Sequence, residues 1–210
     1  MREEGNWWDN DPNPKDLKNL TAPIQSYIRM LRVSYEVIKH VDPDAYICIG
    51  GIGYTSFLDA ILRNTDNPDA GKVTDDYPLK GGAWFDCLSY HVYPMYYLRS
   101  WSGHDTPGNI NGFTYFRTSD EAVDIVIDKK NEMFSLLQKY GYGTEYPSKE
   151  TIITETNIPS KQLNDHIGSN EAQRNFVVKT AISSQLNNIS GVYIYCPWDK
   201  KEEYDATGES

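Results

Sequence analysis

The chain has 210 residues, of which 39% are hydrophobic, and this is enough for one domain with a substantial core. Its 30 acidic residues outnumber its 20 basic ones, and a formal net charge of −10 argues against a surface for nucleic acid or for an anionic membrane. No stretch reaches the ~18–20 apolar residues of a membrane span, and the first residues lack the apolar core of a signal peptide.

Metal and cofactor chemistry has no motif in this sequence. The cysteines Cys48, Cys87 and Cys196 lie in or just after strand-like segments, so we expect buried free thiols rather than disulfides or a metal cluster. The four histidines lack ligand spacing, and no dinucleotide-binding, phosphate-loop or nucleophile-elbow motif is present. We therefore expect neither a metal nor a cofactor. The 16 tyrosines and 5 tryptophans suit a packed core, and they also suit stacking on sugars.

Hydrophobic periodicity predicts helices that alternate with short strands along the chain. The strands are apolar runs without polar alternation, which is typical of strands buried on both faces. In chain order the segments are a helix whose apolar pattern runs over 17–38, with its first turn at Pro23 and its stop at 42–44, a strand over 45–49, a helix over 55–63, a strand over 84–94, a helix over 118–141, a strand over 151–155, a helix from 170 and a strand over 191–198. Strict alternation indicates parallel strands joined by right-handed crossovers, in a single domain spanning 1–210.

Two helix starts carry capping signals. Thr118 and Glu121 fit a capping box, and Asn170 with Gln173 can cap the last helix. The segment 94–117 is rich in glycine, asparagine and aspartate, so a long loop is expected there.

Glycine, polar or aromatic residues stand at the carboxyl ends of the expected strands, namely Gly50-Gly51, His91 with Tyr93, Glu155 and Trp198. In barrels of parallel strands, these ends form the mouth where chemistry is done. Glu155 is the most informative of them, because it ends a continuous apolar run and would point its carboxylate into that mouth. The alternative is that Glu155 begins an ordinary loop.

His91 and Tyr93 are two positions apart on one strand, so both side chains point to the same side of the sheet. There Tyr93 can hydrogen-bond a carboxylate at the mouth, and His91 can line the same pocket. The alternative is a buried histidine and tyrosine satisfied by neighbouring backbone. Trp198 follows Pro197 at a strand end and is expected to form a platform for a sugar, with a plug of the barrel interior as the alternative.

With its strands aligned, the chain resembles the second half of a clan A glycoside hydrolase barrel, of the β-xylosidase and α-iduronidase type. The resemblance runs from about Glu4 to Trp198. It rests on the order and spacing of the segments Tyr35–Lys39, Val41–Ala45, Ser89–Tyr93 and Thr154-Glu155. It implies an α/β fold, a partial (β/α)8 TIM barrel from the end of the fourth strand to the eighth, with the first three to four strands absent from this sequence.

The resemblance implies retaining hydrolysis of polysaccharides or oligosaccharides by two glutamates that lie ~5–5.5 Å apart. Glu155 matches the nucleophile on the seventh strand, and Glu4 matches the general acid/base at the end of the fourth. Glu3 departs from the pattern, because the family has an asparagine there that binds the sugar 2-hydroxyl. Whether Glu3 or Glu4 fills the acid/base position therefore stays open. Asn6 and Trp8 are expected to bind substrate.

One alternative of a different class is an inactive or truncated carbohydrate-binding remnant of the same fold, and another is an incomplete piece without activity. Half a barrel leaves sheet edges and apolar faces uncovered, among them Ile47, Ile49 and Leu88. We therefore expect that the chain alone is not an active monomer, and that it pairs with a second copy, pairs with a missing N-terminal half, or refolds its exposed elements. The resemblance implies a secreted or periplasmic protein if the true N-terminus is missing.

Overall fold

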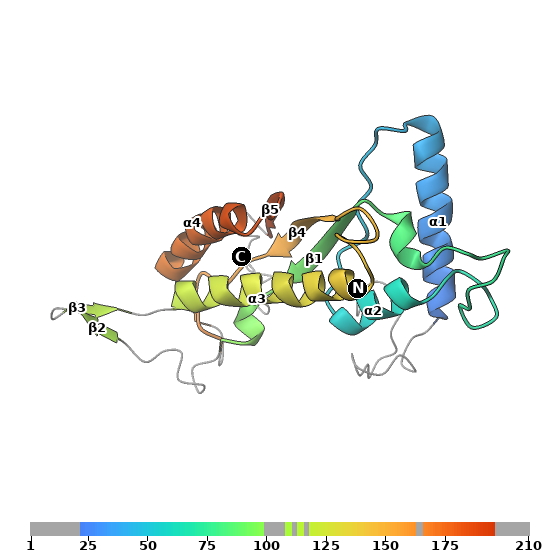
Figure 1. The fold of residues 1–210 in the computed structure, drawn as a ribbon. Coiled ribbons are helices and arrows are strands. Elements are labelled where there is room, and N and C mark those ends of the chain that lie inside the picture. The colour runs from blue at the N-terminus through green and yellow to red at the C-terminus, as the bar shows by residue number, and fades with distance from the viewer. Residues whose placement is uncertain (1–21, 99–107, 111–112, 116–117, 163–165, 196–210) are drawn as a thin grey trace, which may run out of the picture. The chain divides into compact units, whose positions relative to one another are not determined.

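The structure is a computed structural model that describes residues 22–98, 108–110, 113–115, 118–162 and 166–195 (Figure 1). Its helices and strands follow one another along the chain in the order α1 (Ile24–Val41), α2 (Thr55–Arg63), η2 (Gly81–Trp84), β1 (Cys87–Val92), η3 (Pro94–Tyr96), β2 (Gly108–Ile110), β3 (Phe113–Tyr115), α3 (Thr118–Lys139), β4 (Glu150–Thr156), α4 (Asn170–Leu186) and β5 (Gly191–Ile194).

Three strands form a sheet in the order β1-β4-β5. β4 and β5 pair in parallel, because α4 returns the chain to the same edge before β5 begins. Ile152 lies opposite Gly191 and Thr156 lies opposite Ile194, with an irregularity in the register between Ile153 and Thr156. The predicted α/β class with a parallel sheet is confirmed, and the partial barrel stays a prediction.

The prediction of a strand over 45–49 is wrong. Two isolated parallel bridges stand in its place, one between Cys48 and Cys87 and the other between Ile52 and Tyr90. Gly50-Gly51 separates the two bridges, and glycine in a strand adds backbone freedom without a side chain to pack, which interrupts the ladder.

The long loop expected over 94–117 contains a short antiparallel hairpin of β2 and β3, in which Gly108 lies opposite Tyr115 and Ile110 lies opposite Phe113. An Asn-Gly pair stands between the two strands in the sequence, and this pair is a strong hairpin signal. Each strand has three residues, too few for a pattern of alternation to be recognised.

The helices agree better with the sequence. α2 has the predicted bounds, and α1 begins directly after Pro23. The predicted cap of α4 is wrong: Ser169 caps the helix by accepting a hydrogen bond of 3.1 Å from the amide of Ala172. Gln173 instead donates to the carbonyl oxygen of Ile158 at 2.9 Å.

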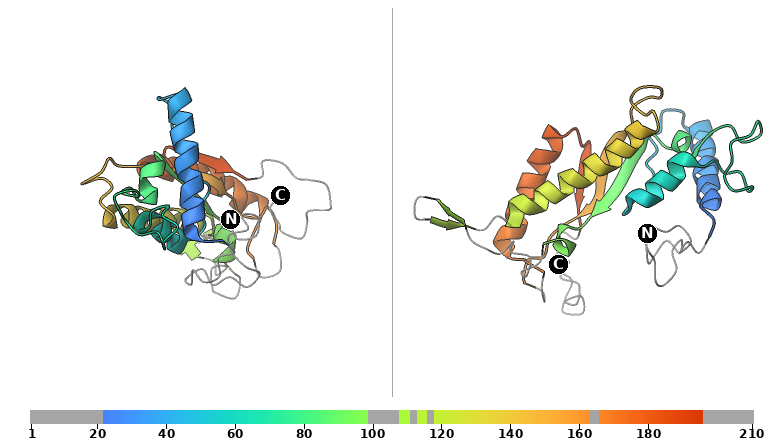
Figure 2. Two further views of the ribbon diagram at one scale, coloured as in Figure 1. Left: turned by 90° about the vertical axis from the view of Figure 1, so that its right-hand side faces the viewer. Right: turned by 60° about the horizontal axis from the view of Figure 1, so that its bottom comes forward.

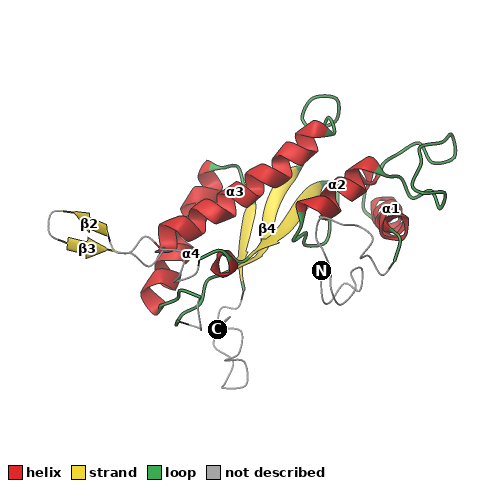
Figure 3. Ribbon diagram, turned by 90° about the horizontal axis from the view of Figure 1, so that it is seen from below, coloured by secondary structure: helices red, strands yellow, loops and turns green. Residues whose placement is uncertain are grey.

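The chain divides into two compact units, one of Met1–Tyr90 with Glu132–Thr151 and the other of His91–Asn131 with Ile152–Ser210. In the first unit α1 contacts α2 (Figure 3), with the rings of Tyr27 and Phe57 packed edge to face at 5.1 Å. Ile49 and Leu88 are fully buried in the structure and Ile47 is half-buried, so the expectation of an uncovered face is wrong for the first two.

In the second unit α4 packs beside β5 (Figure 2). Its core includes Val123, Ile153 and Phe176. The buried stripe of α4 carries Phe176, Thr180 and Ser184 at a spacing of four residues, and Ala181 is exposed.

Apolar side chains are exposed along one stripe of α1, namely Met30, Val33, Val37 and Val41. The expectation of a second copy or a missing half stays a prediction.

Cys87 is a buried free thiol as expected, whereas Cys48 is free but exposed; Cys196 lies outside the described residues. Among the described residues, no helix combines the length and apolar character that crossing a bilayer needs.

Candidate active site

Glu155 lies one residue before the end of β4, at a point where the strand is irregular. The residues on either side are anchored: Ile153 and Thr156 are fully buried, and the carbonyl oxygen of Thr156 accepts from the amide of Tyr195 at 3.1 Å. The register of β4 against β5 shifts between Ile153 and Thr156. Irregularities of this kind re-aim a side chain near a strand end, and here the affected stretch contains Glu155.

Two side chains contact the same oxygen of this carboxylate. The hydroxyl of Tyr93 donates a hydrogen bond to Oε2 of Glu155 at 2.9 Å, and Nδ1 of His91 lies 3.4 Å from that oxygen. His91 belongs to β1, and Tyr93 follows its end directly before the 3-10 turn η3. All three residues belong to the unit of His91–Asn131 with Ile152–Ser210. The expected meeting of His91, Tyr93 and Glu155 is thus present in the structure.

The contacts leave the carboxylate accessible. Its side chain is 35% exposed and that of His91 is 27% exposed. Within the described part of the chain, Oε1 of Glu155 has no hydrogen-bond partner. The arrangement therefore presents one engaged and one unengaged oxygen, as a nucleophile or a general base requires.

Aromatic rings surround Tyr93. Its ring centroid lies 6.4 Å from that of Tyr96 and 6.4 Å from that of Tyr195, both in edge-to-face geometry. Tyr96 in turn packs on His166 at 5.7 Å, and Nδ1 of His166 is hydrogen-bonded to the carbonyl oxygen of Met95 at 2.8 Å. Tyr96 and Tyr195 are half-exposed, so their rings are available to a flat ligand.

Tyr96, Tyr195 and His166 were not predicted as site residues from the sequence. Tyr195 immediately follows β5, so its place at the carboxyl end of a strand was the signal that could have found it. His166 has no such signal, because it lies in a polar loop that approaches Tyr96 only after folding. Of the predicted site residues, Glu4, Asn6, Trp8 and Trp198 lie outside the described residues, and their roles stay predictions.

No group of three or more histidine, cysteine, aspartate or glutamate side chains in the described ranges is arranged to hold a metal ion.

No protein-family model matches the chain, and no curated protein matches its sequence. Solved structures do match. An endo-laminarinase from Formosa aligns with a TM-score of 0.51 at 13% identity, over 85% of this chain and 44% of that chain. A glucosidase from Croceicoccus marinus aligns with a TM-score of 0.48 at 14% identity, over 84% of this chain and 29% of that chain. An active-site mutant of the β-1,3-glucanosyltransferase from Rhizomucor miehei aligns with a TM-score of 0.47 at 13% identity, over 83% of this chain and 47% of that chain.

The likeness to the laminarinase concerns the fold alone. The chain spans less than half the length of each of these three structures.

Proposed function

We propose that this chain is part of a retaining glycoside hydrolase and carries its nucleophile, Glu155. The observation that supports this most is the 2.9 Å hydrogen bond from Tyr93 to Oε2 of Glu155, at the carboxyl end of a parallel strand. Parallel strands place their functional residues at that end. The exposed rings of Tyr96 and Tyr195 add surfaces on which a sugar can stack.

The proposed reaction has two steps. In the first, Oε1 of ionised Glu155 attacks the anomeric carbon, the bond from that carbon to the glycosidic oxygen breaks, and a general acid protonates the departing oxygen. In the second, water attacks the glycosyl-enzyme, its proton passes to the same acid/base group, and Glu155 leaves as a carboxylate. Tyr93 holds Oε2 throughout. We assign the acid/base to Glu4, or to Glu3, from the family resemblance.

The nucleophile can be tested separately from the acid/base. A 2,4-dinitrophenyl leaving group departs without protonation, so it requires the nucleophile alone. We expect the chain, paired with a second copy or with the expected N-terminal half, to cleave at least one of a panel of dinitrophenyl glycosides of glucose, xylose and arabinose in both anomers. The matching 2-deoxy-2-fluoro glycoside should then leave a covalent adduct that peptide mass spectrometry locates on Glu155.

The matched control lies on the same strand. Glu155→Gln should abolish both turnover and the adduct, whereas Glu150→Gln, which changes an exposed carboxylate at the start of β4, should leave both unchanged. An adduct on another carboxylate, or turnover by Glu155→Gln within about tenfold of the wild type, would remove Glu155 from this role.

A second candidate is a protein that binds saccharides without cleaving them. One observation favours it: the cluster of Tyr93, Tyr96 and Tyr195 contains a single carboxylate, Glu155, within the described residues, and hydrolysis needs two. Binding of a saccharide that is lost in Tyr195→Ala, without cleavage of any dinitrophenyl glycoside, would support this candidate over the enzyme.

A further inference from the structure

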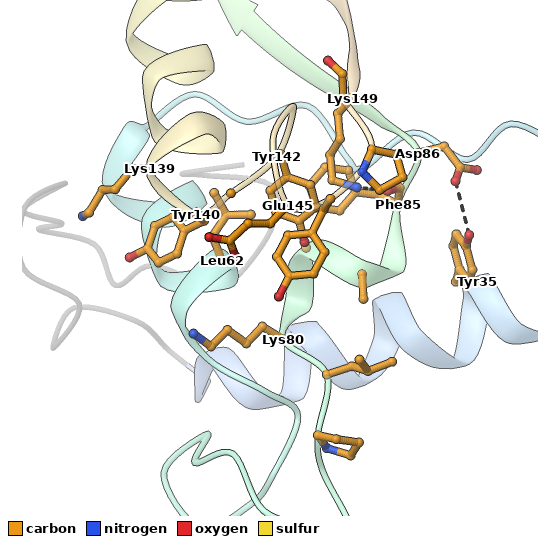
Figure 4. Close-up of a pocket in the computed structure, with 18 of the residues that line it drawn as sticks. Tyr35, Leu62, Lys80, Phe85, Asp86, Lys139, Tyr140, Tyr142, Glu145 and Lys149 are labelled. Atoms are coloured by element: carbon orange, nitrogen blue, oxygen red, sulfur yellow. Dashed lines mark hydrogen bonds between the residues drawn. The ribbon is translucent and has the colours of Figure 1, made fainter.

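A cavity of about 810 Å³ lies in the unit of Met1–Tyr90 with Glu132–Thr151, within the ~300–1,000 Å³ of typical small-molecule sites. The segment that leads into β1 and the turn that joins α3 to β4 form its walls (Figure 4). Lys149, which lines it, directly precedes β4, whereas Glu155 lies near the carboxyl end of that strand. The cavity is therefore distinct from the candidate active site.

Lys149 holds a positive charge inside this cavity. Its ammonium lies 4.3 Å from the ring centroid of Phe85 and 4.5 Å from that of Tyr142, and it donates to the carbonyl oxygen of Phe85 (Figure 4). Burial lowers the pKa of Lys149 to about 8. Within the described residues, no carboxylate lies within 4 Å of this ammonium. A cation that has lost part of its hydration and has no anionic partner favours the binding of an anion beside it.

The charges around the cavity leave a positive excess. Of the other lining residues, Lys139 and Asp86 are each paired with a residue outside the lining. Lys80 has no ion pair within the described ranges, and neither has Glu145. The unpaired charges that line the cavity are therefore two positive ones, on Lys80 and Lys149, and one negative one, on Glu145. This excess occurs in a chain whose net charge is −10.

Tyrosines supply the remaining recognition groups. The rings of Tyr142 and Tyr146 lie 5.3 Å apart at a tilt of 39°, and Tyr46 and Tyr146 are each more than half exposed. The hydroxyls of these three tyrosines have no hydrogen-bond partner among the described residues. Tyrosine combines an apolar face with a polar hydroxyl, which suits a sugar ring better than a wholly apolar ligand. Gly82 makes room for Tyr142, because a Cβ at position 82 would lie 2.1 Å from its hydroxyl oxygen.

We propose that this cavity binds a saccharide that carries a carboxylate, a sugar of the uronic acid type. The ring stacks on Tyr142 and Tyr146, and the carboxylate accepts a charge-assisted hydrogen bond from Lys149. This site does not depend on the role of Glu155.

The test compares cellobiouronic acid with cellobiose, which share the same rings and differ by the carboxylate. Calorimetric titration of the full chain is expected to give about tenfold tighter binding of the acid, the size of one charge-assisted hydrogen bond. Lys149→Met keeps the apolar stem and should remove this difference. Lys72→Met changes an exposed lysine outside the cavity and should preserve it. Glu145→Gln should strengthen binding of the acid, because it removes the unpaired carboxylate.

A second measurement places the ligand without any substitution. Reductive methylation followed by peptide mass spectrometry should show Lys149 protected by cellobiouronic acid and Lys72 unaffected. Equal binding of the two sugars, unchanged preference in Lys149→Met, or no protection of Lys149 would each overturn the proposal. A preference that is lost in Tyr93→Phe but kept in Lys149→Met would assign the binding to the Glu155 site and would overturn it as well.

Discussion

Tyr93 donates a hydrogen bond of 2.9 Å to Oε2 of Glu155, although 62 positions separate the two residues in the sequence. The bond joins the residue that follows β1 to the penultimate residue of β4. It fixes one oxygen of the carboxylate and limits rotation of the whole group. If Glu155 is the nucleophile, this restriction keeps its other oxygen directed at one reaction path.

Tyr93→Phe removes this hydrogen bond and keeps the ring. We expect the kcat/KM of an activated aryl glycoside to fall by about 10- to 100-fold, since a hydrogen bond to a charged group contributes roughly 1.5–3 kcal/mol. The melting temperature should change little. Tyr193→Phe is the control, because Tyr193 is an exposed tyrosine on β5 in the same unit. Equal losses in the two variants would contradict a role for the Tyr93 hydroxyl.

Glu4→Ala should separate good leaving groups from poor ones. Loss of a general acid slows glycosides whose leaving group must be protonated, and it spares dinitrophenyl glycosides at the first step. We expect a far larger fall in kcat/KM for an unactivated disaccharide than for a dinitrophenyl glycoside, with azide restoring turnover of the latter. Glu3→Ala is the comparison variant. The same pattern in Glu3→Ala and not in Glu4→Ala would move the acid to Glu3.

Lys149→Met should raise the free energy of unfolding near neutral pH. Burial lowers the pKa of Lys149 from its ordinary 10.5 to about 8, so the folded protein carries a poorly solvated charge below pH 8. Between these two values the unfolded chain binds more protons than the folded chain, and the wild type therefore gains stability as the pH rises. Urea unfolding at about pH 7 and about pH 10 should show that the difference in free energy of unfolding between the variant and the wild type is smaller at the higher pH. An advantage that is independent of pH would contradict this account.

Ser169→Ala should destabilise α4 by removing the side-chain oxygen that accepts from the amide of Ala172. Substituting a serine N-cap by alanine costs about 0.5–2 kcal/mol. Thermal unfolding followed by circular dichroism should show a lower melting temperature. Ser190→Ala, at an exposed serine before β5, should leave the melting temperature unchanged. If both variants melt at the wild-type temperature, the cap contributes nothing measurable.

Patterns that repeat over several residues were predictable, and single local contacts were not. The bounds of α2 followed from its apolar spacing, since Phe57, Leu58, Ile61 and Leu62 are all buried. Asn170 and Ser169 are both good caps, and the choice between them depends on backbone angles that the sequence does not show.

The candidate site was predicted where it depends on strand geometry. His91 and Tyr93 share a face because side chains alternate along β1. The packing of Tyr96 on His166 depends instead on the path of a loop, which periodicity does not describe. The cavity around Lys149 was missed for the same reason, since the turn between α3 and β4 supplies many of its lining residues.

The irregular stretch of β4 has a consequence for how this sequence can vary in length. Side chains alternate between the two faces of a strand, and the irregularity after the buried Ile153 changes the direction of those that follow, so the direction of Glu155 depends on the number of residues in this stretch. We expect the loss or gain of one residue there to carry the carboxylate away from Tyr93. A change of one residue in the length of β4 would therefore move Glu155 out of its site.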